Sequence, residues 1–431
     1  MSLIALLLVI YTGSRAFAQT EKYNVLFIAI DDLNDYVTLL EGYPGLKTPN
    51  LDKFAQTALT FTQAYCAAPV CNPSRIAVMT GIKPTRTGVY ENTDAFQDSP
   101  EAVAATLLPE LFKQNGYTTA WSGKIFHTRP HEERLNAMWD DMEGHDGGYG
   151  PIPTEENVSA EITRPNWFNY QAWEGADTDF PDVVNSTLTI DRLKQSYNQP
   201  FFMALGLYRP HNPWTAPQRF FDMHPLESVE LPEVLENDLE DLPPIARQWA
   251  HSPVKLDDLK KIDQWKPVVR SYLASISFMD DNLGRVLDAL NNSPHRDNTI
   301  VVLWADHGFH MGEKKHFAKF ALWEKTTHVL FMARIPGMTE GGQSRHQPVN
   351  LLDIYPTLVD LCGLPAPKQS LDGESLISLI KDENAERAQP SITYYQQGSV
   401  GIRTSDWRYI KYYDGAEELY DEKKDPKEFN N

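Results

Sequence analysis

The stretch Tyr23–Asp32, with the sequence YNVLFIAIDD, is the clearest indicator of the fold class. Its residues up to Ile30 are mostly apolar and rich in β-branched and aromatic side chains, which predicts a buried strand. The run then ends in two carboxylates, Asp31 and Asp32. In open α/β sheets, ligands bind beyond the carboxyl ends of the strands, so this stretch also indicates where a site belongs.

Similar apolar runs recur along the chain and alternate with helical patterns. Further strands are predicted at Thr118–Ser122, Pro200–Leu207 and Thr299–Trp304. Helical spacing connects the apolar residues from Tyr272 to Leu290, and Gly116 ends a predicted helix over Thr106–Asn115. Strands that alternate with helices predict an α/β fold with a mostly parallel central sheet flanked by helices.

Two other regions differ from this core in amino-acid composition and in the structure that their sequence predicts. Residues 136–182 are rich in glycine, proline and aromatic residues without a clear period, which predicts loops over the sheet that carry specificity. Short antiparallel strands are predicted at Ile392–Tyr395, Val400–Arg403 and Trp407–Tyr413. We therefore expect a catalytic domain over residues 19–385 and a small C-terminal antiparallel domain over 386–431, which the abrupt stop at Asn431 suggests is truncated.

The N-terminus has the pattern of a signal peptide. An apolar run over residues 3–10 is too short to span a bilayer, and Ala16-Phe17-Ala18 follows it as an A-x-A-like cleavage site. The run lacks a preceding Lys or Arg, so a buried N-terminal strand is the alternative. We expect residues 1–18 to be removed and the protein to be periplasmic or secreted; no other segment has a transmembrane pattern.

The net charge restricts the class of binding partner, and the cysteine count restricts the disulfide pairing. The formal net charge of −20 argues against nucleic acid or an anionic membrane surface as a partner. An odd cysteine count in an exported protein leaves at least one cysteine unpaired. The sequence leaves open whether Cys66 and Cys362 form a disulfide, and the oligomeric state is equally open.

Polar clusters follow directly on the predicted strands. They are Asp31-Asp32, Lys124 with His127, His211, and Asp306-His307. Carboxylates brought together repel unless a cation lies between them, and their oxygens suit Ca²⁺ or Mg²⁺. An imidazole ligand such as His307 is more typical of Zn, Cu, Fe or Ni, and an Asp pair after a strand can also cap a helix.

The segment Cys71-Asn72-Pro73-Ser74-Arg75, continuing to Thr80-Gly81, is the most specific motif. A thiol at a helix start is expected to be reactive, whereas most cysteines are small buried core residues. The pattern C-x-P-S-R-x-x-x-x-T-G resembles the signature of the type I sulfatases. In that family, a dedicated maturation enzyme oxidises this cysteine to formylglycine.

The resemblance extends over nearly the whole chain after the signal peptide. Further segments resemble family landmarks, namely Gly123-Lys124-x-x-His127, Arg209-Pro210-His211-x-Pro213, Asp306-His307-Gly308 and Ala318-Lys319-Phe320. The resemblance implies an alkaline-phosphatase-like fold and one divalent metal, Ca²⁺ with Mg²⁺ as the alternative. His307, where many arylsulfatases carry Asn, is similar to the iduronate 2-sulfatase branch and implies a sulfated sugar as substrate.

The same resemblance implies a role for each site residue. The implied metal ligands are Asp31, Asp32, Asp306, His307 and the modified Cys71. The implied catalytic residues are Cys71 as nucleophile, Arg75 and Lys124 holding its hydrate, Lys124 and Lys319 neutralising sulfate, His127 as base and His211 as acid. Lys319 is the second choice for the acid.

Some alternatives remain at this stage. Lys314 and Lys315 compete with Lys319, whereas His310 and His316 are expected to be solvated loop residues and Trp121 and Trp214 to pack in the core. A phosphatase or phosphonate hydrolase of the same superfamily is the nearest rival function. A glycan-binding protein without turnover is the other, if Cys71 is unmodified.

Overall fold

The computed structural model describes residues 22–40, 42–144, 148–152, 168–251 and 253–431. The predicted signal peptide and part of the predicted loop region over 136–182 lie outside these residues. Within the described ranges, no helix is long and apolar enough to cross a membrane.

A seven-stranded sheet forms the centre, in the order β10-β2-β9-β8-β1-β6-β4. Strand β1 (Asn24–Ile30) lies between β8 (Thr299–Ala305) and β6 (Phe201–Leu207) and is parallel to both. Strand β4 (Thr118–Gly123) extends the parallel part beyond β6. The other edge contains β9 (Phe331–Arg334), which is antiparallel to its neighbours, then β2 (Leu59–Phe61) and β10 (Gln343–Arg345). The predicted mostly parallel sheet is confirmed.

The register places the strand ends together. Ile30 at the end of β1 pairs with Leu207 of β6 and with Ala305 of β8. All residues of β1, β6 and β8 are buried, as expected for parallel strands covered on both faces. The residues that follow these strands therefore emerge side by side at one edge of the sheet.

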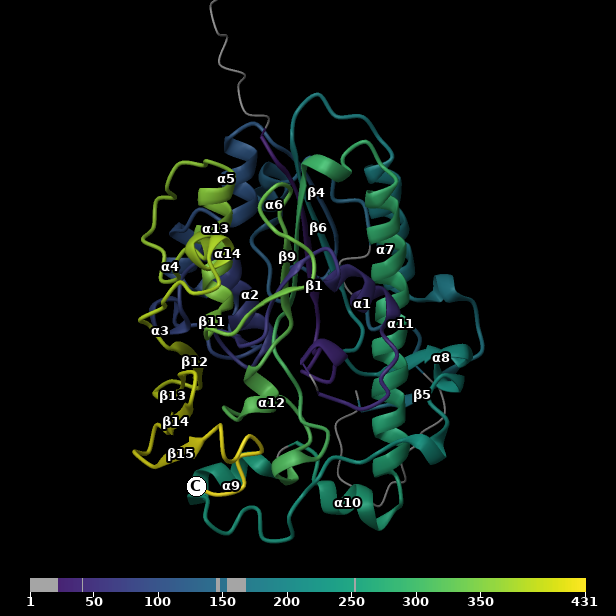
Figure 1. The fold of residues 1–431 in the computed structure, drawn as a ribbon, viewed down its shortest axis with the longest axis vertical. Coiled ribbons are helices and arrows are strands. Elements are labelled where there is room, and N and C mark those ends of the chain that lie inside the picture. The colour runs from purple at the N-terminus through teal and green to yellow at the C-terminus, as the bar shows by residue number, and fades with distance from the viewer. Residues whose placement is uncertain (1–21, 41, 145–147, 153–167, 252) are drawn as a thin grey trace, which may run out of the picture.

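Helices cover both faces of the sheet (Figure 1). One face carries α1 (Pro49–Ala55), α7 (Pro181–Leu193) and the long α11 (Trp265–Asn291). The other carries α2 (Cys71–Thr80), α5 (Leu108–Gln114) and α13 (Ile354–Leu361). The predicted helices are present, each with ends shifted by a few residues, because terminal residues are set by capping contacts and not by the apolar pattern.

Several short elements have no counterpart in the sequence analysis. Strand β5 (Tyr170–Trp173), within the region predicted as loops, pairs with β7 (Trp214–Pro217), and β3 (Ala64–Tyr65) pairs with β11 (Val349–Asn350). Strands this short have too few residues to show a period. The remaining short helices are α3 (Pro84–Thr87), α4 (Pro100–Ala104), α6 (Glu132–Met138), α8 (Gln218–Asp222), α9 (Pro244–Ala250), α10 (Leu256–Lys261), α12 (Glu324–Thr327) and α14 (Ile377–Lys381).

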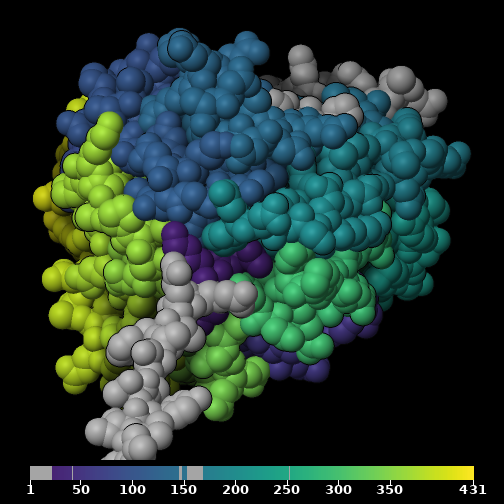
Figure 2. All heavy atoms as spheres, turned by 90° about the horizontal axis from the view of Figure 1, so that it is seen from above, coloured from purple at the N-terminus to yellow at the C-terminus, as the bar shows by residue number. Residues whose placement is uncertain are grey.

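The C-terminal part forms a separate antiparallel sheet. Its strands, β12 (Ser391–Tyr395), β13 (Ser399–Arg403), β14 (Trp407–Lys411) and β15 (Glu417–Asp421), pair in sequence order. Hydrogen bonds join this sheet to the main body, including Tyr394 N to Ala67 O at 2.8 Å. Figure 2 shows the yellow-green C-terminal part packed beside the blue N-terminal half. The domain boundary at residue 385 remains a prediction.

Candidate active site

Helix α2 places Cys71 and Arg75 at the carboxyl end of the sheet. Cys71 is its first residue, and Arg75, one turn further, lies on the same side of the helix. Gly81 ends the helix in the left-handed conformation with φ 67°, which is readily accessible only to glycine. Both Cys71 and Arg75 are fully buried, so any charge there must be balanced by neighbours.

Three carboxylates emerge from the neighbouring strands β1 and β8. Arg75 donates from Nε to Asp306 Oδ2 at 2.8 Å and from one terminal nitrogen to Asp31 Oδ1 at 3.1 Å. The backbone N–H of Asp32 donates to Asp306 Oδ1 at 3.1 Å, with Asp32 itself in the left-handed region at φ 60°. The strand ends therefore converge, as their clusters in the sequence predicted.

Two lysines complete the charge balance. Lys124 Nζ lies 2.5 Å from Asp31 Oδ2, and Lys319 Nζ lies 2.7 Å from Asp32 Oδ1 and 2.9 Å from Cys71 Sγ. The backbone turn that presents Lys124 requires glycine at position 123. Its φ is +75°, and a Cβ there would lie 2.0 Å from the carbonyl oxygen of Gly206. Lys124 and Lys319 are both brought to the site, as the sequence predicted.

The three predicted histidines surround the same centre. His307 Nε2 lies 3.2 Å from Cys71 Sγ and 3.3 Å from Asp32 Oδ1. His211 Nε2 lies 3.8 Å from Asp32 Oδ2. His127, which is half-buried, hydrogen bonds with the Cys71 thiol.

The electrostatics favour an anion at position 71. Burial opposes the charged thiolate, but Lys124, Lys319 and His307 outweigh it and hold the pKa of Cys71 well below its ordinary value. In the same way, burial opposes the charged form of Lys319, yet Asp32 and Cys71 raise its pKa. The site therefore stabilises negative charge at position 71 and positive charge at Lys319.

The donor atoms fit a metal ion. Four residues each offer one ligand atom, and these atoms all lie within 4.8 Å of one another. The residues are Asp31, Asp32, Cys71 and His307. Asp32 Oδ2 is buried and accepts no hydrogen bond from the part of the chain that the structure describes. A buried carboxylate oxygen without a partner is costly, and a cation would satisfy it. Asp306 lies outside this group, with its oxygens engaged by Arg75 and by two backbone N–H groups.

Two expectations about the segment after Asp306 require correction. His310 and His316 are 1% and 0% exposed, not solvated. His316 bonds through Nε2 to the backbone oxygen of Lys319 at 2.7 Å, whereas His310 stacks on the ring of Trp323. The pattern of polar residues predicted a loop, and contacts with Ala250 at the end of α9 and with Trp323 help to bury it.

The two competing lysines, Lys314 and Lys315, bind partners outside the site. Lys314 Nζ lies 3.1 Å from Asp238 and also donates to the backbone oxygen of Glu428, and Lys315 Nζ donates to Glu236 O at 2.6 Å. Only tertiary contacts distinguish these two lysines from Lys319, which reaches the site.

The cysteines and tryptophans outside the site also have definite places. Cys66 and Cys362 are both free, so the disulfide that the sequence left open does not form. Trp121 and Trp214 pack in the core as expected.

Two residues that support the site, Asn72 and Tyr272, were not found from the sequence. The amide of Asn72 joins the start of α2 to two segments, donating to Glu91 O and accepting from Thr128 N at 3.1 Å. The Tyr272 hydroxyl donates to Asp32 O at 2.8 Å. Asn72 lies inside the motif around Cys71, and this position could have indicated its role in the site. Tyr272 was predicted only as part of the apolar face of a helix, and nothing in the sequence indicated its contact with Asp32.

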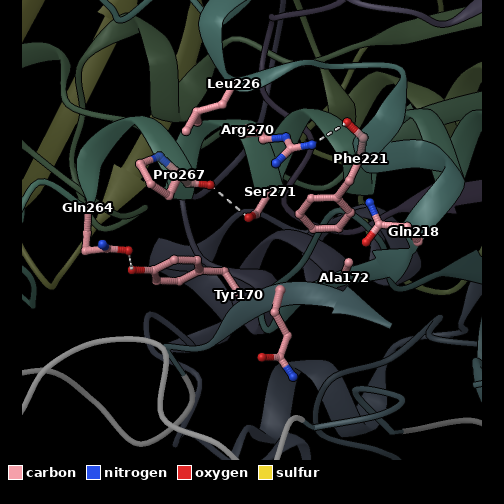
Figure 3. Close-up of a pocket in the computed structure, with 10 residues that line it drawn as sticks. Tyr170, Ala172, Gln218, Phe221, Leu226, Gln264, Pro267, Arg270 and Ser271 are labelled. Atoms are coloured by element: carbon pink, nitrogen blue, oxygen red, sulfur yellow. Dashed lines mark hydrogen bonds between the residues drawn. The ribbon is translucent and has the colours of Figure 1, made fainter. Parts of the chain in front are cut away.

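A cavity of about 330 Å³ lies between β5, α8 and α11 (Figure 3). Its wall includes Tyr170, Phe221 and Arg270, and none of the predicted site residues. Ser271 also borders it, whereas the next residue, Tyr272, contacts the site through Asp32. The cavity and the charged centre are therefore separate, and α11 contributes residues to the surroundings of both.

Comparison with known proteins agrees with this arrangement. The sulfatase family model matches residues 23–364, and a model of the N-sulphoglucosamine sulphohydrolase C-terminal region matches residues 312–431. The chain belongs to the sulfatase family. It is a sulfuric ester hydrolase, an enzyme that hydrolyses sulfate esters.

Particular relatives differ in how much they share. A sulfatase of Formosa agariphila is 38% identical over 429 residues, covering 96% of this chain and 83% of the relative. Human iduronate 2-sulfatase is 28% identical, and the match covers 82% of this chain and 71% of the human protein. The fold is shared with a protein solved with its substrate D-glucosamine-2-N,6-O-disulfate (TM-score 0.73, 21% identity, 95% and 93% of the two chains). It is also shared with the Agrobacterium radiobacter phosphonate monoester hydrolase (TM-score 0.76, 21% identity, 95% and 91%).

Proposed function

We propose that this enzyme removes sulfate from sulfated sugars, with formylglycine made from Cys71 as the nucleophile and Ca²⁺ as the cofactor. The observation that carries the proposal is the convergence of Lys319, His307 and two aspartates on Cys71, which is fully buried at the start of α2. The sulfur atom occupies the place of the nucleophilic oxygen. It would be replaced by an aldehyde oxygen when the maturation enzyme oxidises the thiol.

Asp31, Asp32, His307 and residue 71 would hold the cation, with Asp306 beside them as a further ligand. A divalent cation bound there would stabilise negative charge on sulfate oxygens as a Lewis acid. Oxygen ligands favour Ca²⁺ over softer metals, and the replacement of sulfur by oxygen at position 71 adds to that preference. Mg²⁺ is the alternative.

The hydrated aldehyde has two hydroxyl groups, and the site uses each in turn. Arg75 and Lys124 would hold the hydrate while one hydroxyl gives its proton to Asp32, whose Oδ1 lies 3.7 Å from Cys71 Sγ. The oxygen of that hydroxyl then forms a bond to sulfur, and the bond from sulfur to the leaving oxygen breaks. Lys124 and Lys319 would neutralise the sulfate, as their positions beside Asp31 and Cys71 allow. His211 would give a proton to the leaving alkoxide, which is a poor leaving group without one, and Lys319 is the second candidate for that role.

The second hydroxyl then regenerates the enzyme. His127, already hydrogen bonded at position 71, would take its proton. The carbonyl re-forms, the bond from carbon to the sulfate oxygen breaks, and inorganic sulfate leaves before water restores the hydrate. A serine or an unmodified cysteine has no second hydroxyl and could not complete this elimination.

A sugar substrate is supported by relatives and by the site. Similar proteins include an ulvan-active sulfatase of Formosa agariphila and an N-acetylglucosamine-6-O-sulfatase of Bacteroides thetaiotaomicron, at 28% and 24% identity. His307 is the feature shared with the iduronate 2-sulfatase pattern. Phosphonate hydrolysis is the rival within the shared fold, and it predicts a preference for phosphorus esters.

The deciding experiment compares three substrate types on purified holoenzyme loaded with Ca²⁺. We expect turnover of nitrophenyl sulfate to exceed that of nitrophenyl phosphate, and a panel of defined sulfated oligosaccharides to give at least one substrate. A strong preference for the phosphate would overturn the sulfatase mechanism. Mass spectrometry of the tryptic peptide containing residue 71, from protein made in its native host, should show the lighter aldehyde; an intact thiol would favour a binding protein without turnover.

We also propose export and a two-part organisation. Residues 1–18 would be the signal peptide, residues 19–385 the catalytic domain and residues 386–431 a small C-terminal domain. The maturation enzyme would then be a partner before folding, because Cys71 is fully buried in the folded chain. N-terminal sequencing of protein from periplasm or medium should begin at residue 19; a mature chain that retains Met1 would contradict export by cleavage.

A further inference from the structure

The side of the site around His211 contains an aromatic residue that none of the proposed roles uses. The ring of Tyr149 stacks on that of His211, with centroids 5.2 Å apart and planes 28° apart. Tyr149 also makes an edge-to-face contact with Tyr208, whose ring lies 5.6 Å from Lys124 Nζ. Tyr149 therefore packs on the proposed acid and on a neighbour of a proposed sulfate-binding lysine.

Tyr149 is held in this position by a buried cation. Arg209, which is 1% exposed, donates to Tyr149 O at 2.6 Å, to His211 O at 3.2 Å and to Thr215 O at 2.8 Å. Asp182 in turn accepts from the backbone N–H of Arg209 at 2.8 Å. One guanidinium thus fixes the backbone of both Tyr149 and His211, so their stacked arrangement is a built feature and not a surface contact.

The orientation of the His211 ring connects the stacking contact with Tyr149 to the charged centre. Its Nε2 faces Asp32 at 3.8 Å, toward the centre where sulfate would bind, while its ring face meets Tyr149. The centre itself is closed, since Cys71, Lys124, Lys319 and His211 are only 0–8% exposed. Tyr149 is 42% exposed. A part of the substrate that leaves the centre on the side of His211 would therefore contact this exposed ring.

We propose that Tyr149 is a specificity-determining residue that contacts the leaving-group sugar and holds its oxygen beside His211. A pyranose ring presents apolar C–H faces that pack on aromatic rings, and Tyr offers a rigid contact of this kind. The inference rests on the proposed carbohydrate sulfatase function. It assigns to Tyr149 the binding of the leaving group, a task separate from the attack on sulfur.

The test measures kcat/KM for two substrates on the Ca²⁺-loaded, formylglycine-containing enzyme. They are nitrophenyl sulfate, whose leaving group is a stable anion, and the sulfated oligosaccharide that the wild type hydrolyses fastest in the panel. We expect Tyr149→Ala to lower the ratio of sugar to aryl activity by about tenfold or more, because a lost aromatic contact affects the sugar ester most. Tyr149→Phe, which retains the ring, should stay within about threefold of wild type.

Tyr413→Ala is the matched control, because Tyr413 is an exposed tyrosine (55%) in the C-terminal region, and its ratio should not change. If Tyr149→Ala leaves the ratio unchanged, or Tyr149→Phe lowers it as much as Tyr149→Ala, the inference is wrong while the function stands. If the wild type hydrolyses aryl sulfate but no sulfated sugar, the carbohydrate function fails and the role of Tyr149 fails with it. The wild-type panel and the variant ratios therefore separate the two failures.

Discussion

Among the buried groups of opposite charges that the described residues form, two differ in their consequences. The first joins Asp31, Asp32 and Asp306 with Arg75, Lys124 and Lys319 at the end of the parallel sheet. The second joins Arg403 and Arg408 of the C-terminal sheet with Glu324, Glu422 and Glu428. Both are buried and contain similar numbers of acids and bases, so composition alone does not distinguish a reactive centre from a structural one.

Geometry makes the distinction. In the first cluster a thiol and an imidazole join two carboxylates around one point, with ligand atoms within 4.8 Å of one another. In the second, Arg408 lies between carboxylates of three segments, 3.2 Å from Glu422 and 2.7 Å from Glu428, and also contacts Glu324. Arginine can bind several carboxylates with its planar group, which suits a structural junction. The first cluster is arranged for a ligand and the second joins two parts of the chain.

The largest effect is expected at the nucleophile. Cys71→Ala should lower kcat/KM for nitrophenyl sulfate by about 10⁴-fold or more, because it removes the bond-forming residue. The unfolding midpoint should change little, which steady-state kinetics and thermal denaturation would show together. Cys66→Ala, at another fully buried cysteine, should retain activity. Substantial turnover by Cys71→Ala would remove the nucleophile from the proposal.

The next effect concerns the structural cluster. Arg408→Met should lower the free energy of unfolding by about 3–5 kcal/mol, because it leaves buried carboxylates without a counter-charge. Activity per folded molecule should remain within about threefold. Urea denaturation with activity assays on the folded fraction measures both. Arg219→Met, at the half-exposed pair with Asp177, is the control and should cost less than about 1 kcal/mol. An inactive but stable Arg408→Met would reverse the assignment of the two clusters.

A third test uses metal binding. Ca²⁺ at about 100 times its dissociation constant should raise the free energy of unfolding of the wild type by about 2.7 kcal/mol, since it binds only the folded state. Asp32→Asn should abolish most of this rise. Asp35→Asn, a nearby buried acid paired with Lys325, should retain it. Equal stabilisation of both variants by Ca²⁺ would show that the ion binds away from Asp32.

The smallest effect is a pH dependence of stability in the structural cluster. Burial, with Glu324 nearby, raises the pKa of Glu422 to about 8, from an ordinary value near 4.5. The folded state then binds more protons than the unfolded state between these values, so this residue lowers stability as pH rises from 4.5 to 8. Glu422→Gln should therefore gain about 1–2 kcal/mol relative to wild type between pH 5 and pH 8. Glu417→Gln, at an exposed residue of β15, the strand that ends just before Glu422, should show no such trend in parallel urea titrations.

Most of the fold could be predicted, because long strands and helices show their periods locally. The run that ends at Asp31 predicted β1, and the face from Tyr272 to Leu290 predicted most of α11. What failed was short or dependent on contacts. Strand β5 has four residues and exists through pairing with β7, and the burial of His310 and His316 comes from segments distant in sequence.

The amino-acid sequence alone was enough to predict the class of enzyme and the residues near its centre. The motif around Cys71 is contiguous, and each strand delivers its polar residues at a known edge of a parallel sheet, so local information was sufficient. Only the tertiary structure decided which lysine reaches Cys71, whether Cys66 and Cys362 bond, and that Arg209 holds Tyr149 against His211. These are contacts between side chains far apart in the chain, and no local pattern encodes them.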